Sequence, residues 1–183
     1  FLPVSSSGHI EFLKHIINNP TIQKEGAFIT VILHLATALS IIVIFRQKLK
    51  KILFRYNSES KNYILKVLVS MIPVAILVLF NIDQNIENKY NEGWGLIFIA
   101  IMFLITGMIL FFTEKISIKT KNITYIAALI IGIAQAIAIL PGISRSGLTI
   151  CCALLLGATK KEASTFSFLI CLPIILGKSF KDL

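Results

Sequence analysis

Four stretches of the chain are each long and apolar enough to cross a lipid bilayer, and they limit the possible folds more than any other feature. They cover residues 27–45, 63–80, 94–112 and 123–140. A membrane-spanning helix needs about 20 mostly apolar residues, because its backbone polar groups must be paired within the segment. The composition agrees, since only 15% of the residues are charged, against about 25% in a soluble domain. We therefore predict an all-α, polytopic membrane protein, with residues 1–183 as a single transmembrane domain.

The basic residues lie between the apolar stretches and predict an orientation. Residues 46–61 carry six Lys or Arg against one Glu, and residues 113–122 carry three Lys against one Glu. Residues 81–93 carry three acids against one Lys. Because basic loops stay in the cytoplasm, the first and third connections are predicted inside and the second outside. The net charge of +9 thus gathers in loops rather than on one face, and nucleic-acid binding is not predicted.

Two further apolar stretches, residues 148–157 and 163–177, are too short to cross a bilayer, and the second contains Pro173. Short apolar pieces interrupted by Gly or Pro are typical of re-entrant segments. Alternation of the four spans places residues 140–147 on the outer side, together with the segment before residue 27.

The chain contains an internal repeat. LPVSSSG at residues 2–8 resembles LPGISRSG at residues 140–147, with a gap of one residue, and both are followed by an acid and a Phe. We predict a duplication with copies around residues 1–45 and 140–178. Membrane proteins built from repeats often bind their substrate where the copies meet.

The second loop, residues 141–149, combines a cation with glycines and hydroxyls. Arg145 offers a planar, always-charged fork that suits phosphate oxygens, and glycines let the backbone approach a ligand. The alternative is a polar turn whose Arg snorkels to the membrane surface. The repeated partner loop favours a phosphate site, in which Arg145 acts with Gly142, Ser144, Ser146, Gly147 and Thr149.

The first loop, residues 3–9, supplies hydroxyls and an imidazole. A hydroxyl beside a base is the minimum for a nucleophile or for proton transfer, so Ser6 and His9 are the candidate catalytic residues. The alternative is a serine-capped helix start. Ser5, Ser7 and Gly8 are the candidate binding residues of this loop.

Polar residues also lie within the predicted spans. Gln135 comes six residues before Pro141, so a binding role and a packing role are equally open. His34 is less strongly favoured as a site residue. Such residues usually face the interior of a membrane bundle.

The two loops together resemble those of the undecaprenyl-diphosphate phosphatases, a family known also for bacitracin resistance. The resemblance rests on LPVSSSGH at residues 2–9, LPGISRSGLT at residues 140–149 and EASTFSF at residues 162–168. It implies inverted repeats and two re-entrant helix-loop elements. It also implies that Ser6 and His9 are active residues of the first loop and that Arg145 binds phosphate.

The resemblance further implies a substrate, a cofactor and a location. The substrate would be a C55 polyprenyl diphosphate, cleaved to phosphate and the lipid carrier of cell-wall synthesis, at the outer face of the bacterial cytoplasmic membrane. A divalent cation, Mg²⁺ or Ca²⁺, would be bound by a Glu-rich motif that precedes the first loop. The chain is accordingly expected to be a fragment lacking both ends and to hold no metal ligand itself. A homodimer is a candidate assembly.

Two other functions fit the same architecture. A transporter or flippase of lipid carriers would also have inverted repeats with broken helices. It would not need a proton-moving group beside a hydroxyl, and the Ser, His and Arg combination therefore favours an enzyme. A structural membrane subunit would tolerate the joint loss of Ser6, His9 and Arg145.

Overall fold

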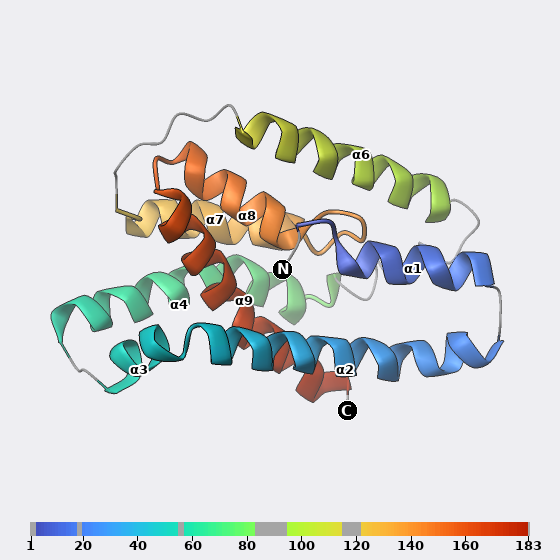
Figure 1. The fold of residues 1–183 in the computed structure, drawn as a ribbon, viewed down its shortest axis with the longest axis horizontal. Coiled ribbons are helices and arrows are strands. Elements are labelled where there is room, and N and C mark those ends of the chain that lie inside the picture. The colour runs from blue at the N-terminus through green and yellow to red at the C-terminus, as the bar shows by residue number, and fades with distance from the viewer. Residues whose placement is uncertain (1–2, 18–19, 55–56, 83–94, 115–121, 183) are drawn as a thin grey trace.

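The computed structural model describes residues 3–17, 20–54, 57–82, 95–114 and 122–182, which form a bundle of helices (Figure 1). The helices are α1 Ser6–Ile17, α2 Pro20–Ile44, α3 Arg46–Phe54, α4 Ser58–Leu79, α6 Gly95–Glu114, α7 Tyr125–Ile137, α8 Arg145–Leu155 and α9 Lys160–Asp182.

Several of these helices are long and apolar enough to cross a membrane. Three qualify alone: α4, α6 over Gly95–Thr113, and α9 over Lys160–Ser179. The later part of α2 and the whole of α3 qualify as a pair, bent by 76°. Side chains such as Leu104, 70% exposed, and Ile126, 73% exposed, cover the outside with apolar surface, as a lipid environment requires. The predicted all-helical, polytopic membrane fold is confirmed.

Two predictions about span length are wrong. Residues 123–140 do not form a full span, because α7 has 13 residues and reaches only about 20 Å of a hydrocarbon core about 30 Å thick. Residues 163–177 are not a short re-entrant piece, because they belong to the 23 residues of α9. Pro173 lies inside α9 without ending it, since neighbouring helices in a membrane bundle can satisfy the backbone group that a Pro leaves unpaired.

α7 and α8 form a hairpin of two short helices that enters the bundle and returns. α8 has 11 residues, and α7 and α8 pack against each other. The amide of Ile123, just before α7, donates to Oε1 of Glu162 at the start of α9, at 3.3 Å. Both outer ends of the hairpin therefore lie near the start of α9. Because α7 is not a full span, alternation of the spans does not determine the side of the membrane at which the tip of the hairpin lies.

The helices pack closely where small residues meet. α4 runs along α7, and a Cβ on Gly132 would overlap the backbone carbonyl of Ser70. Fully buried Ile131, Phe166 and Ile170 continue this contact into one apolar cluster. The hairpin is thus held rigidly against α4 and α9.

The two predicted repeat copies have the same succession of helices. α1, of 12 residues, leads into the 25-residue α2, and α8, of 11 residues, leads into the 23-residue α9. α2 and α9 pack together and run in opposite directions across the bundle (Figure 1). The opposed directions are those expected of inverted copies.

Candidate active site

The two loops predicted from the repeat lie against each other. A Cβ placed on Gly8 would lie 2.8 Å from both the Cα and the backbone nitrogen of Gly142. Gly142 has a φ of +94°, and a Cβ there would lie 2.6 Å from the Cβ of Met102. Real Cβ contacts are not this short. The first loop can therefore meet the second because residue 8 is glycine, and the second loop can meet α6 because residue 142 is glycine.

The two loops end in matching helix caps. The Oγ of Ser5 accepts a hydrogen bond from the amide of Gly8 at 3.3 Å, and the Oγ of Ser144 accepts one from the amide of Gly147 at 3.1 Å. In each loop a second serine hydroxyl, two residues later, lies 3.5 or 3.4 Å from the capping oxygen. The likeness of the two motifs is therefore also a likeness of local geometry.

This geometry makes Ser6 and Arg145 equivalent, because each is the first residue of its helix after the capping serine. The first turn of a helix has amides without helical partners, and its partial positive charge attracts anions. The two copies thus bring a hydroxyl and a guanidinium to two neighbouring helix starts.

Thr106 of α6 holds the second loop in place. Its Oγ1 donates to the carbonyl of Gly142 at 2.9 Å and accepts from the amide of Ser144 at 3.1 Å. Thr106 is 5% exposed, so both hydrogen bonds are shielded from water. One buried hydroxyl therefore satisfies two backbone groups of the turn that leads to Arg145.

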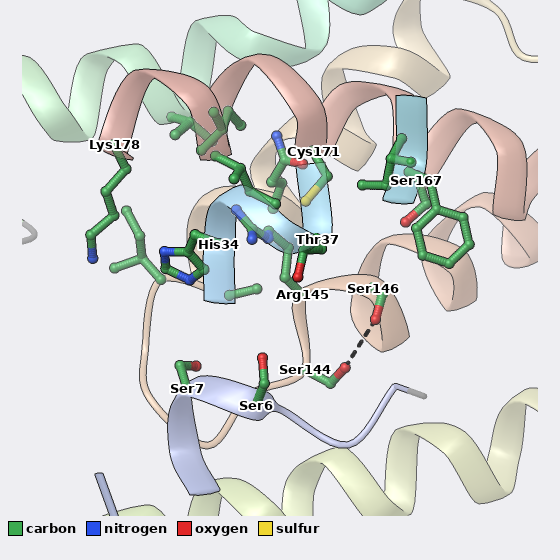
Figure 2. A pocket seen from close by; sticks show the side chains of 18 of the residues that line it. Ser6, Ser7, His34, Thr37, Ser144, Arg145, Ser146, Ser167, Cys171 and Lys178 are labelled. Atoms are coloured by element: carbon green, nitrogen blue, oxygen red, sulfur yellow. Dashed lines mark hydrogen bonds between the residues drawn. The ribbon is translucent and has the colours of Figure 1, made fainter. Parts of the chain in front are cut away.

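A cavity of about 820 Å³ opens between the loops and α2, α4 and α9. Of the residues predicted for the site, it is lined by Ser5, Ser6, Ser7, Gln135, Ser144, Arg145 and Ser146. In Figure 2, Arg145, Ser6 and Ser7 surround one open space, with Ser144 bonded to Ser146 at its edge. Hydroxyls and one guanidinium thus form the polar part of a largely apolar cavity.

The other predicted residues do not line this cavity. His9 is exposed and its ring lies 4.8 Å from that of Phe103. Its Nδ1 donates to the carbonyl of Ser5 at 2.9 Å, which leaves Nε2 as the proton acceptor. Gly8, Gly142 and Gly147 are closely packed, since an added Cβ would lie 3.2 Å or less from a neighbouring atom. The hydroxyl of Thr149 donates to the carbonyl of Arg145 at 2.8 Å.

Comparison with known proteins identifies the family of the chain. The family described as bacitracin resistance protein BacA matches residues 1–183. The chain belongs to this family. The family resemblance predicted from the two loops is confirmed.

Proteins similar to this chain are named undecaprenyl-diphosphatase. The protein from Christiangramia forsetii is 43% identical over 188 residues, which cover all of this chain and 70% of that protein. The proteins from Thermosipho africanus and Methanococcus vannielii are 42% and 40% identical over 183 residues, each covering 97% of this chain and 70% of the relative.

Gln135 presents unsatisfied polar atoms in this BacA-family cavity. It is 2% exposed, and within the described part of the chain neither its Oε1 nor its Nε2 has a hydrogen-bond partner. A buried amide without partners costs stability unless a ligand or water satisfies it. Gln135 therefore remains a candidate binding residue, with an amide that lies beneath the cavity surface in this structure.

The described residues do not fit the divalent cation that the resemblance implies. Among them, no three His, Cys, Asp or Glu side chains lie close enough to hold a metal ion. Mg²⁺ and Ca²⁺ take oxygen ligands and above all carboxylates. The cavity lining contains no carboxylate within the described ranges.

The sequence did not identify Thr106 and Lys178 as residues of this region, and it contained Ser167 only as part of the stretch EASTFSF. Lys178 and Ser167 line the cavity from α9, and Ser167 pairs with Thr149 at 2.6 Å between their hydroxyl oxygens. Lys178 carried one usable signal, a charge at the end of an apolar stretch. Thr106 carried none, because an isolated Thr in an apolar helix usually bonds to its own helix. His34, only weakly favoured from the sequence, also lines the cavity.

Proposed function

We propose that this chain is a membrane phosphatase that hydrolyses undecaprenyl diphosphate to undecaprenyl phosphate and inorganic phosphate. The meeting of Ser6 and Arg145, equivalent first residues of two serine-capped helices, in one cavity of an apolar bundle carries this proposal. A hydroxyl and a fixed cation at adjoining anion-binding helix starts suit phosphoryl transfer. The name undecaprenyl-diphosphatase, shared by relatives such as that of Christiangramia forsetii, supports the substrate.

In the proposed reaction Arg145 binds the terminal phosphate and neutralises the charge that grows on its oxygens. The Oγ of Ser6 forms a bond to the terminal phosphorus while the bond from phosphorus to the bridging oxygen breaks. Its electron pair leaves with undecaprenyl phosphate. Water then hydrolyses the phosphoserine, which releases inorganic phosphate and restores Ser6. In support, Ser6 lines the cavity, and its hydroxyl makes no hydrogen bond within the described residues.

His9 is the proposed proton acceptor for Ser6. The two residues are three positions apart on α1 and are therefore neighbours on one helix face. The bond from Nδ1 to the carbonyl of Ser5 selects the tautomer whose Nε2 can take a proton. His9→Gln tests this role, and we expect a lower kcat with a KM close to that of the unmodified protein.

The lipid tail is proposed to lie along the apolar walls of the cavity. These walls come from α2, α4 and α9 and include Leu33, Met71, Val78 and Ile174. A prenyl chain can contact them while the diphosphate remains at the loops, since apolar surface binds without directional requirements.

The cavity is proposed to open at the outer face of the bacterial cytoplasmic membrane. Lys50 and Lys51 of α3 and Lys160 at the start of α9 mark a basic end of the bundle, which the positive-inside rule assigns to the cytoplasm. The cavity is lined by later parts of α4 and α9, residues 71–78 and 167–178, which lie away from that end.

A divalent cation and a homodimer are further parts of the proposal. We expect Mg²⁺ or Ca²⁺ to be held by the acidic motif that the resemblance places ahead of the first loop. Light scattering of the detergent-solubilised protein tests the dimer.

The test of the function is phosphate release from undecaprenyl diphosphate by the full-length protein in detergent, with and without a chelator. We expect release that stops with the chelator and returns when Mg²⁺ or Ca²⁺ is added. A folded sample that releases no phosphate contradicts the phosphatase, and flux of lipid carrier in vesicles would then support a transporter.

A further inference from the structure

Two cationic side chains and one imidazole line the cavity. They are Arg145 of α8, Lys178 of α9 and His34 of α2, and the lining contains no carboxylate among the described residues. Figure 2 shows the three side chains extending into the same space from three different helices. Ionisable side chains that line a cavity of a membrane bundle often mark the path of a substrate.

His34 and Lys178 lie at a similar level along the packed pair α2 and α9. The rings of Phe45 and Phe168 lie 5.9 Å apart, and the two helices run in opposite directions (Figure 1). Lys178 is ten residues after Phe168, and His34 is eleven before Phe45. At about 1.5 Å per residue, both lie about 15 Å from that contact, so the two side chains can bind one group.

The two cations of the cavity differ in exposure. Arg145 is half-buried at the loops, whereas Lys178 is exposed at the rim. A diphosphate esterified to a lipid has two phosphates that need separate partners, one that leaves and one that stays on the lipid. Arg145 and Lys178 come from different helices, so each can bind one of the two phosphates of such a ligand.

We infer that His34 and Lys178 form a second anion-binding position, which holds the phosphate that remains on the lipid while Arg145 holds the phosphate that leaves. This inference rests on the proposed function. It makes Lys178 a residue that distinguishes a lipid diphosphate or monophosphate from free inorganic phosphate.

Lys178→Gln in the full-length protein tests the position. We expect the KM for undecaprenyl diphosphate to rise about tenfold, the loss of one charge-assisted contact, with little change in kcat. The inhibition constant of undecaprenyl phosphate should rise by a similar factor, and that of inorganic phosphate should stay unchanged. Lys178→Arg should retain the KM and both inhibition constants of the unmodified protein. Lys160→Gln, at the other end of α9, is the matched control and should change none.

Other outcomes overturn the inference. An unchanged KM and unchanged lipid inhibition in Lys178→Gln would show that Lys178 contacts neither phosphate. Equal weakening of inorganic phosphate would place Lys178 at the leaving phosphate instead. For His34→Leu we expect weaker inhibition by undecaprenyl phosphate. A change confined to kcat would show that His34 is not part of the second anion-binding position.

Direct binding of undecaprenyl phosphate, measured by calorimetry, separates this inference from the proposed function because it needs no turnover. Weaker binding by Lys178→Gln than by Lys160→Gln supports the second position even in a protein that releases no phosphate. Equal binding by the two variants contradicts it even in an active phosphatase.

Discussion

The starts of α1 and α8 share one cap and differ in the residue that follows it. Ser5 and Ser144 each accept a hydrogen bond from a glycine amide three residues later. The next residue is Ser6 in α1 and Arg145 in α8. The two helix starts therefore share a cap that leaves amides open to an anion, and they differ in one residue: a hydroxyl that can react in α1 and a guanidinium that can hold charge in α8.

The two starts also differ in backbone strain. Ser5 has a φ of 60°, a left-handed value that non-glycine residues rarely adopt, whereas Ser144 has a φ of −75°. The strained cap belongs to the loop with the candidate nucleophile, and the unstrained cap belongs to the loop held by Thr106. Strained backbone is often found at functional sites, where the surrounding packing maintains it.

Removing the hydroxyl that follows the first cap should have the largest effect. For Ser6→Ala we expect kcat for phosphate release to fall about 10³-fold or more, because the bond to phosphorus can no longer form. Ser7→Ala is the matched control and should lose much less activity. Mass spectrometry of a quenched reaction should detect phosphate on Ser6 in the unmodified protein. Near-normal turnover by Ser6→Ala would mean that water attacks the terminal phosphorus directly, without a phosphoserine.

Removing the cation that follows the second cap should have the next largest effect. Arg145→Ala is expected to lower kcat/KM about 10²- to 10³-fold, the usual cost of losing one group that stabilises transition-state charge. Arg145→Lys should recover part of the lost kcat/KM, since Lys keeps the charge but not the planar fork of Arg. Arg46→Ala, at the junction of α2 and α3, is a control that leaves the cavity intact. Normal turnover by Arg145→Ala would rule out its phosphate-binding role.

The contact between the two loops can be disturbed without touching a reacting group. Gly8→Ala adds a Cβ that would lie 2.8 Å from the Cα and the backbone nitrogen of Gly142 and should destabilise the fold by about 1–3 kcal/mol. Gly107→Ala has no atom within 4 Å of the added Cβ and should not destabilise it. Thermal unfolding in detergent compares the two variants. Equal midpoints would show that the loops do not need this close approach.

Loss of the hydrogen bonds from Thr106 to the second loop should have the smallest of the four effects. Thr106→Val keeps the side-chain shape but removes both hydrogen bonds to the loop, and we expect kcat/KM to fall about tenfold. Thr106→Ser should restore activity. Thr113→Val, whose hydroxyl bonds to the carbonyl of Ile109 in its own helix, is the matched control. If Thr106→Val and Thr113→Val behave alike, the loop does not depend on Thr106.

The parts of the site predicted from the sequence are those carried by local motifs. Ser6 and Arg145 could be found because each lies in a repeated loop, one with hydroxyls beside an imidazole and the other with hydroxyls beside a guanidinium. The direction of a side chain is different, because packing of distant elements decides it. Thus Thr149, predicted to bind substrate, instead contacts Ser167 and the backbone of Arg145.

The sequence by itself determined the membrane environment, the helical fold and the likeness of the two loops, since apolar length, composition and short motifs act within one segment. Only the tertiary structure decided which residues share the cavity. Lys178 joins it because α9 continues through Pro173, and Thr106 reaches the second loop because α6 packs beside it. Both depend on contacts between segments far apart in the chain, which no local pattern specifies.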